Sequence, residues 1–241
     1  MIARILGLFQ TDSTAPHLLQ RDFWSERAIR QGFAAFLEQH RSALSGKRIL
    51  DYGAGVSPYT SLVAKIGASL LPADIGDPGP GGVAIHPDGR VDLPDNSVDA
   101  IVSTQVLEHV PDVQRYLGEA MRVLRPGAPM FLSTHGDWVL HRIPTDFRRW
   151  TIDGLRYECE KAGFAVESVE PAVGILASST HLRTMVIYGV LKNAPLLGWL
   201  NPIVFLASNL RMGLEDLITP ESVMASHPQL VLVVARKPAS T

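Results

Sequence analysis

The loop Asp51-Tyr52-Gly53-Ala54-Gly55 combines residue types that suit a ligand site. Its glycines lack a Cβ atom, so the backbone can turn sharply and approach a ligand, and the helix that follows directs free N–H groups toward it. The acid before the glycines favours a cationic ligand, because Asp51 would repel the pyrophosphate of a dinucleotide. We therefore predict that Asp51, Tyr52, Gly53 and Gly55 bind a cofactor with a positively charged group.

The residues around this loop argue against a nicotinamide dinucleotide. Such a cofactor needs a third glycine shortly after Gly55, where this chain has Ser57-Pro58, and Pro58 has no N–H to offer a phosphate. Asp74 ends the next predicted strand, a position from which an acid can accept hydrogen bonds from both ribose hydroxyls. The alternative for Asp74 is an ordinary solvated turn aspartate.

A second stretch, residues 133–151, holds two histidines, two aspartates, two tryptophans and three arginines. Histidine or aspartate can remove a proton, arginine can hold an anionic acceptor, and tryptophan can stack on a ring or a sugar. We predict that His141 and Asp146 act as an acid/base or acceptor-positioning pair, with His135 as the next candidate. In one alternative, Asp146 and Arg149 form an internal ion pair that braces the loop while His141 binds the backbone. In another, His135, His141 and an aspartate hold a metal, but their spacing is weak for this and we predict no metal.

Hydrophobic periodicity predicts a doubly wound α/β fold that brings both stretches to one edge of a sheet. A helix within 18–44 precedes the first strand, and strands then alternate with helices, which favours a parallel seven-stranded sheet with helices on both faces. In such a sheet ligands bind beyond the carboxyl ends of the strands. The predicted strands are 48–51, 69–73, 83–86, 99–104, 129–134, 165–173 and 229–235, with helices at 59–66, 113–124 and 152–162; Thr151 is predicted to cap the last helix and Gly163 to end it.

The length and composition fit a single domain, 1–241. We predict an N-terminal helical segment (1–45), a cofactor-binding core (46–174), a hydrophobic helical insertion (175–228) and a final strand (229–236). A net charge of −2 gives no broad positive field, so nucleic acid is not an expected partner. The single cysteine, Cys159, permits no disulfide within the chain, and the N-terminus lacks a secretory signal, so a cytoplasmic location is expected.

The segment 175–217 is rich in Leu, Ile, Val and Trp, so we expect its apolar side chains to be shielded from water by another surface. Polar residues, prolines and Gly198 interrupt it before about 20 apolar residues accumulate, so we predict no transmembrane helix. Three roles remain for it: a lid over the acceptor pocket, a homodimer interface, or docking on a membrane surface. Because only Arg183, Lys192 and Arg211 supply positive charge, a lid or an interface ranks ahead of peripheral membrane contact.

A series of motifs across about 46–173 resembles class I S-adenosylmethionine-dependent methyltransferases, in particular a methyltransferase type 11-like branch. The motifs are RILDYGAGVSPYT, the strand-ending Asp74, DLPDNSVDAIVSTQVLEHV, and RVLRPG followed by MFLSTHG. The resemblance implies a Rossmann-like methyltransferase sheet and S-adenosylmethionine as the cofactor. It also implies that Asp88 and Gly89, or else Asp92 and Leu93, lie beside the adenine, and that Gln105 and His109 lie near the methionine part. The chain departs from the usual pattern of this family in two ways: Ser57 stands where the third glycine is expected, and the spacing from Asp88 to Leu93-Pro94 is one residue longer than common.

The second stretch resembles a signature from a branch of these methyltransferases, several of which are associated with glycans or cell-surface polymers. The matching residues are His141, Pro144, Asp146, Arg149, Thr151, Gly154, Leu155 and Ala162-Gly163-Phe164. Methyl transfer is an in-line displacement that mainly needs alignment and exclusion of water, with a general base useful for a hydroxyl acceptor. We predict methyl transfer to an oxygen of a small-molecule or glycan-type acceptor. The rivals are a noncatalytic cofactor-binding or scaffold protein on the same fold and an NAD-dependent oxidoreductase.

Overall fold

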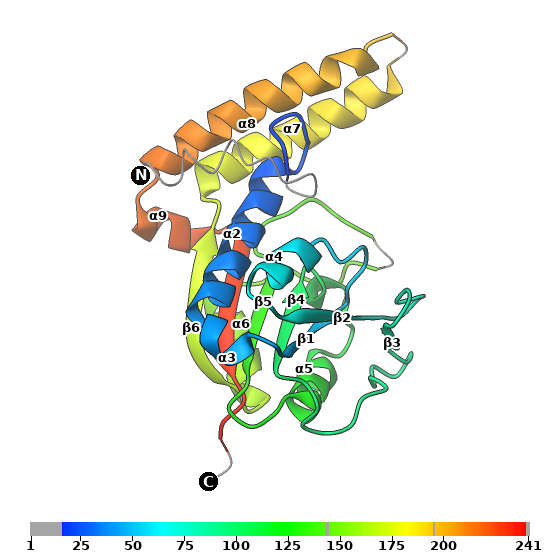
Figure 1. The fold of residues 1–241 in the computed structure, drawn as a ribbon. Coiled ribbons are helices and arrows are strands. Elements are labelled where there is room, and N and C mark those ends of the chain that lie inside the picture. Colours follow the sequence, from blue (N-terminus) through cyan, green and yellow to red (C-terminus); the bar gives the residue numbers. More distant parts are fainter. Residues whose placement is uncertain (1–15, 143–144, 195, 240–241) are drawn as a thin grey trace.

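The computed structural model describes residues 16–142, 145–194 and 196–239, and its centre is a seven-stranded sheet (Figure 1). The strand order is β3-β2-β1-β4-β5-β7-β6. The predicted α/β sheet is confirmed, while residues 1–15 of the predicted N-terminal segment lie outside the described residues. The strands are β1 (Arg48–Tyr52), β2 (Ser69–Asp74), β3 (Val83–Ala84), β4 (Ala100–Thr104), β5 (Pro129–His135), β6 (Ala165–Ala172) and β7 (Leu230–Arg236).

The predicted parallel pairing is confirmed for β1 to β5, whereas β7 runs antiparallel between β5 and β6, so the sheet is mixed. The reason lies in the path of the insertion. The chain leaves β6 at the carboxyl edge of the sheet and the inserted helices stay at that edge, so β7 enters from there and runs back (Figure 1). Strand β3 is also shorter than predicted, because Ile85 turns away to form an antiparallel bridge with Val91.

Each face of the sheet has its own hydrophobic core, as expected for strands whose side chains alternate between faces. On β4, Ile101 packs in one core with helices α5 (Val113–Val123) and α6 (Ile152–Lys161). Its neighbours Ala100 and Val102 pack in the other with α2 (Phe23–Gln39) and α4 (Thr60–Lys65). A four-residue helix, α3 (Arg41–Leu44), follows α2.

The ends of α6 follow the sequence prediction. The Thr151 side chain accepts a hydrogen bond from the Gly154 N–H at 3.0 Å, which satisfies one free donor of the first turn. Gly163 follows the helix with φ at +94°, a left-handed conformation that glycine adopts without a Cβ penalty. This conformation of Gly163 lets the chain change direction between the end of α6 and the start of β6.

The insertion forms an antiparallel helical hairpin that projects from the domain (Figure 1). It consists of α7 (Ile175–Asn193), the short helix η3 (Gly198–Leu200) and α8 (Asn201–Ile218), and α9 (Glu221–Ser226) then leads into β7. The two long helices are joined by a 2.8 Å hydrogen bond from Thr184 to Ser208 and by a ring contact of Tyr188 with Phe205 at 5.7 Å. No helix in the described parts of the chain is long and apolar enough to cross a membrane.

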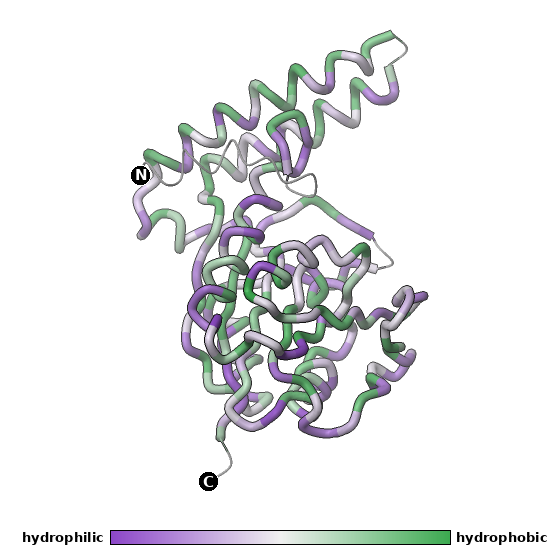
Figure 2. The backbone as a smooth tube through the Cα atoms, in the orientation of Figure 1, coloured by the Kyte–Doolittle hydropathy of each residue, from purple (hydrophilic) through white to green (hydrophobic). Residues whose placement is uncertain are grey.

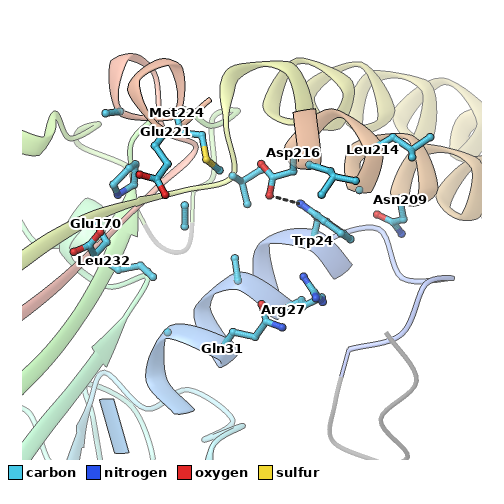
Figure 3. A pocket seen from close by; sticks show the side chains of 18 of the residues that line it. Trp24, Arg27, Gln31, Glu170, Asn209, Leu214, Asp216, Glu221, Met224 and Leu232 are labelled. Carbon is cyan, nitrogen blue, oxygen red and sulfur yellow. Dashed lines mark hydrogen bonds between the residues drawn. The ribbon is translucent and has the colours of Figure 1, made fainter. Parts of the chain in front are cut away.

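A cavity of about 950 Å³ opens at the base of the hairpin, between α2, α8, α9 and the β6–β7 edge of the sheet (Figure 3). Trp24 lines it, and the indole N–H of this residue donates a 3.3 Å hydrogen bond to Asp216 on α8. None of the residues predicted to bind cofactor or to act in catalysis lines this cavity. It is therefore separate from the candidate site described below.

Candidate functional site

The cofactor loop follows β1 and needs glycine at one position for two reasons. Gly53 has φ at +84°, and a Cβ built on it would lie 2.5 Å from a methyl group of Val106. The loop is held to the end of β2, because Gly53 donates to the Ala73 carbonyl at 2.9 Å and the Gly55 N–H donates to the Asp74 carboxylate at 2.7 Å. The turn after β1, the end of β2 and the segment after β4 thus meet at one point.

Two carboxylates stand at this point, and their electrostatics favour a cation. Asp51 is 2 % exposed, and burial together with the nearby Asp74 charge raises the pKa of Asp51 to about 7. The Ser57 hydroxyl donates a 2.7 Å hydrogen bond to Asp51, which opposes part of this rise. Ser57 has φ at +48°, so the serine that replaces the family's third glycine still adopts a left-handed conformation and adds a donor to the acid.

The Tyr52 side chain lies in the core and faces away from the loop. Its ring is fully buried and stacks on Tyr116 with centroids 4.1 Å apart. Its hydroxyl donates to the Gly89 carbonyl at 3.3 Å, which brings the predicted adenine-side turn next to β1. Asp88 pairs with Arg115 at 3.0 Å, and Asp92 pairs with His86 at 2.8 Å. Both candidate adenine-side acids are thus held by cationic or imidazole side chains near the surface.

Gln105 follows β4 in a strained conformation, with φ at +56°. Its side-chain amide donates to the Ser133 hydroxyl at 3.0 Å. Its Oε1 atom is buried and has no hydrogen-bond partner among the described residues. An unpaired buried acceptor costs free energy, so a donor from a ligand would be stabilised there. The next residue, Val106, is the one that contacts the Gly53 turn, so Gln105 lies beside the cofactor loop.

Three histidines gather where β4 and β5 end. His109 lies on the short helix η2 (Leu107–His109), His135 ends β5, and His141 follows it. The ring of His141 lies 5.4 Å from that of His109 and 6.4 Å from that of His135, between centroids. His135 also stacks on Trp138 at 4.5 Å. The predicted cofactor residue His109 and the predicted acceptor-side histidines thus form one cluster.

A buried acid beneath this cluster, Glu108, was not predicted from the sequence. It is completely buried, accepts a 2.9 Å hydrogen bond from Thr134, and has one carboxylate oxygen 3.3 Å from the His135 ring. Burial raises the pKa of Glu108. The signal in the sequence was a charged residue within the otherwise apolar run Val106-Leu107-Glu108 directly after a predicted strand. Glu108 therefore lies against His135, although its Oε1 atom has no hydrogen-bond partner among the described residues.

Asp146 and Arg149 form the internal ion pair that was one of the two alternatives for this loop. The guanidinium contacts both carboxylate oxygens, at 2.5 and 2.6 Å, and also donates to the Trp138 and Val139 carbonyls. This pairing holds the pKa of Asp146 at about 2. Asp146 also accepts a 2.7 Å hydrogen bond from the His141 backbone N–H. An acid held in this way is a poor proton acceptor near neutral pH, so the geometry favours a positioning role for Asp146.

His109 and His141 each offer a ring nitrogen for proton transfer, whereas buried His135 is a weak base. Burial lowers the pKa of half-buried His141, with His109 contributing, and burial lowers that of His135 to about 3, so both rings are neutral near pH 7. His109 has its Nδ1 atom 2.7 Å from the Thr145 carbonyl, which can only accept, so Nδ1 carries the hydrogen and a neutral ring keeps its lone pair on Nε2. His109 and His141 are both partly exposed, whereas His135 is buried. Ile143 and Pro144 lie outside the described residues.

The alternative of a metal held by His135, His141 and an aspartate gains no support from the geometry. Within residues 16–142, 145–194 and 196–239, no cluster of His, Cys, Asp and Glu is arranged to hold a metal ion. The Asp146 carboxylate instead forms an ion pair with Arg149.

Comparison with known proteins identifies the class of protein that this fold and site define. The methyltransferase domain family matches residues 23–169, and the chain belongs to this family. A protein of Mycolicibacterium smegmatis named probable S-adenosylmethionine-dependent methyltransferase is 32% identical over 136 residues, which cover 51% of this chain and 49% of that protein. The ubiquinone biosynthesis O-methyltransferase of Xanthomonas oryzae pv. oryzae is 28% identical over 190 residues, covering 73% and 66%.

Solved structures support the fold. Phosphoethanolamine N-methyltransferase 2 of Haemonchus contortus, in complex with S-adenosyl-L-methionine, superposes with a TM-score of 0.54 at 14% identity, covering 95% of this chain and 60% of that one. At this identity the likeness concerns the fold alone. The chain spans about half the length of the first curated relatives it matches. The predicted family and its cofactor, S-adenosylmethionine, are confirmed.

The titration of Asp51 leads to a first prediction. An ionised Asp51 attracts the ammonium group of the cofactor, and a protonated one does not. Since the raised pKa of Asp51 is about 7, affinity for S-adenosylmethionine is lost as the pH falls through 7. We expect the dissociation constant to be about tenfold larger at pH 6 than at pH 8. In Asp51→Asn, which keeps an oxygen to accept from Ser57, binding is weak and this pH dependence disappears. Calorimetric titration of both proteins tests this, and an unchanged pH dependence in the variant contradicts it.

Proposed function

We propose that this protein is an S-adenosylmethionine-dependent methyltransferase that transfers a methyl group to an oxygen of a small-molecule or glycan-type acceptor. The observation that carries the proposal is the cluster of neutral imidazoles at the ends of β4 and β5, next to a loop that suits a cationic cofactor. A neutral imidazole within reach of a hydroxyl can act as the general base that assists oxygen methylation. The name of the Xanthomonas relative, an O-methyltransferase, supports the same choice of atom.

The residues present fit this cofactor. The Asp51 carboxylate and the unpaired Gln105 oxygen offer acceptors to its ammonium group, and Asp74 offers a carboxylate to the ribose. When bound there, S-adenosylmethionine supplies an activated methyl group. His141 would take the proton of the acceptor hydroxyl on a ring nitrogen, and the sulfur–methyl bond of the cofactor would break as the acceptor oxygen bonds to the methyl carbon. Asp146, fixed by Arg149, holds the backbone of His141 in place.

The tryptophans of this segment favour a small acceptor over a glycan. Trp138 is stacked on His135 and meets the edge of His181 at 4.7 Å, and Trp150 is 8 % exposed within the core. Both rings are therefore engaged inside the protein and are poorly placed to stack on a sugar. The resemblance of residues 141–164 to glycan-associated methyltransferases is what keeps the glycan-type acceptor as the second candidate.

Calorimetry followed by a turnover screen tests the proposal. We expect S-adenosylmethionine and its demethylated product to bind and NAD to give no heat of binding. With a panel of phenols, aliphatic alcohols, sugars, thiols and amines, we expect the demethylated product to accumulate with a hydroxyl compound. Binding without turnover on any acceptor would support the noncatalytic scaffold, and binding of NAD would support the oxidoreductase.

A further inference from the structure

The α7–α8 hairpin carries large apolar side chains that the described parts of the chain leave uncovered. Six of them are between 51 % and 69 % exposed, and we call them the hairpin surface: Val186, Val190, Trp199, Ile203, Leu210 and Leu214. Leu210 and Leu214, nearest the domain, also line the cavity at the base of the hairpin. Figure 2 shows hydrophobic residues along both helices. Exposed apolar surface of this extent marks an interaction site more often than a chance feature.

The base of the hairpin is firmly held, so this surface is presented in a fixed position. The Asn209 side chain donates to the Leu18 and Gln20 carbonyls at 2.7 and 2.8 Å. Asp216 accepts from the Trp24 indole at 3.3 Å. From this base, the distal half of the hairpin extends away from the sheet (Figure 1). The half of α7 nearest the sheet reaches the candidate site through His181, whose ring contacts Trp138 at 4.7 Å.

The charge of this segment favours an anionic surface as the partner. Between Glu170 and Glu215 the sequence contains no aspartate or glutamate, and Arg183 and Lys192 supply positive charge, while Arg211 forms an ion pair with Glu215 at 2.7 Å. An apolar hairpin whose distal part carries cationic and no anionic side chains binds where headgroups are negatively charged and acyl chains are near. Trp199, 69 % exposed on η3, is of the residue type that prefers the membrane–water interface.

A second copy of the chain is the competing partner, and the geometry favours it less. The exposed stripe of α8 from Ile203 to Leu214 is about 17 Å long and about 10 Å wide. Such a strip is much smaller than the roughly 800 Å² that each partner of a stable complex buries. The rest of the hairpin surface lies on α7 and η3. A protein partner covers one face of a projecting hairpin, whereas a lipid surface can surround its end.

We propose that the hairpin surface docks on the interface of an anionic phospholipid bilayer, with the hairpin lying among the headgroups. This inference is independent of the proposed methyl transfer, since it rests on residues outside the candidate site. It places peripheral membrane contact ahead of the lid and the dimer interface, which the sequence alone ranked first.

Vesicle flotation of the full chain tests this proposal. Phosphatidylcholine vesicles with phosphatidylglycerol should carry the protein upward in a density gradient, and vesicles without it should carry less. The double substitution Trp199→Ser, Ile203→Ser should lower the partition coefficient at least about tenfold. Lys192→Gln should lower it about fivefold on the anionic vesicles. All three side chains are exposed, so circular dichroism melting should show unchanged folding.

Matched controls lie outside the hairpin. Tyr157, on α6, is 59 % exposed, and Lys65, on α4, is also exposed. Tyr157→Ser and Lys65→Gln should float as the parent protein does. The proposal is overturned by a parent protein that stays with neither kind of vesicle, or by a double variant that floats normally. It is also overturned if light scattering shows a dimer that the double substitution dissociates, because a second copy then occupies the surface.

Discussion

Replacing His141 with glutamine is expected to lower kcat about 10²- to 10⁴-fold while leaving the affinity for S-adenosylmethionine unchanged. Glutamine keeps the approximate size and hydrogen-bonding capacity of the side chain but has no basic nitrogen. The backbone N–H of residue 141 still reaches Asp146, so the loop keeps its anchor. Turnover and calorimetric binding measured on the same preparation separate the two effects.

The pH profile provides a second readout. The neutral imidazole is the active form, and burial lowers the pKa of His141 below its usual value of 6.5. With S-adenosylmethionine kept saturating, so that the weaker binding caused by protonated Asp51 has no effect, turnover of the parent protein should therefore persist below pH 6.5 and fall only in more acidic solution. Residual turnover of His141→Gln should not show this step. His17→Gln, at an exposed histidine outside the site, serves as the control. If His141→Gln retains full turnover and His109→Gln does not, the base is His109 and our assignment is wrong.

Asp146→Asn is expected to reduce both stability and turnover. The Asp146 side chain is 2 % exposed, and the substitution leaves the Arg149 guanidinium partly buried without its counter-charge. Breaking a buried ion pair in this way costs about 3 kcal/mol of unfolding free energy. The loop that carries His141 should loosen as well, so kcat should fall although the acid itself transfers no proton.

The sign of the pH dependence follows from the pKa of Asp146, which falls from its usual 3.8 to about 2 in the folded state. The stability that this group contributes is complete above pH 4 and is lost as the pH falls through 2. The difference in unfolding free energy between the parent protein and Asp146→Asn should shrink over that range in urea titrations. Arg149→Met and the double variant complete a cycle that should show coupling between the two residues. An Asp146→Asn protein with full stability but no turnover would instead assign proton transfer to Asp146.

Local sequence patterns were enough to predict the cofactor half of the fold. The strand that ends at the Gly53 turn and the capped helix after Thr151 depend on neighbouring residues, and both are present in the structure. The direction of β7 could not be predicted in this way, because it depends on where the inserted helices leave the chain in space. The shortening of β3 likewise depends on a bridge between Ile85 and Val91 that no periodicity reveals.

In the candidate site, too, local sequence predicted some features, and others depend on the tertiary structure. His135 and His141 were predicted together from one stretch, and His109 was predicted separately as a cofactor residue. Only the structure shows that all three form one cluster, because the proximity of two strand ends is a tertiary property. For Glu108 the only signal in the sequence was its place after two apolar residues that follow a predicted strand, since its complete burial is invisible in the sequence. The ion pair of Asp146 with Arg149 was foreseen as an alternative, and the geometry gives it the bracing role. The catalytic assignment of His141 stays a prediction.

The position of β7 has a consequence for how the chain is assembled during synthesis. β7 pairs with β5 on one side and β6 on the other, yet it is the last strand described in the chain. Until Leu230–Arg236 has left the ribosome, β5 and β6 each present an unpaired edge, while the apolar hairpin that precedes β7 is already exposed. Unpaired strand edges and exposed apolar helices are the features by which nascent chains aggregate. The nascent protein therefore passes through a vulnerable stage that ends only when this strand closes the sheet.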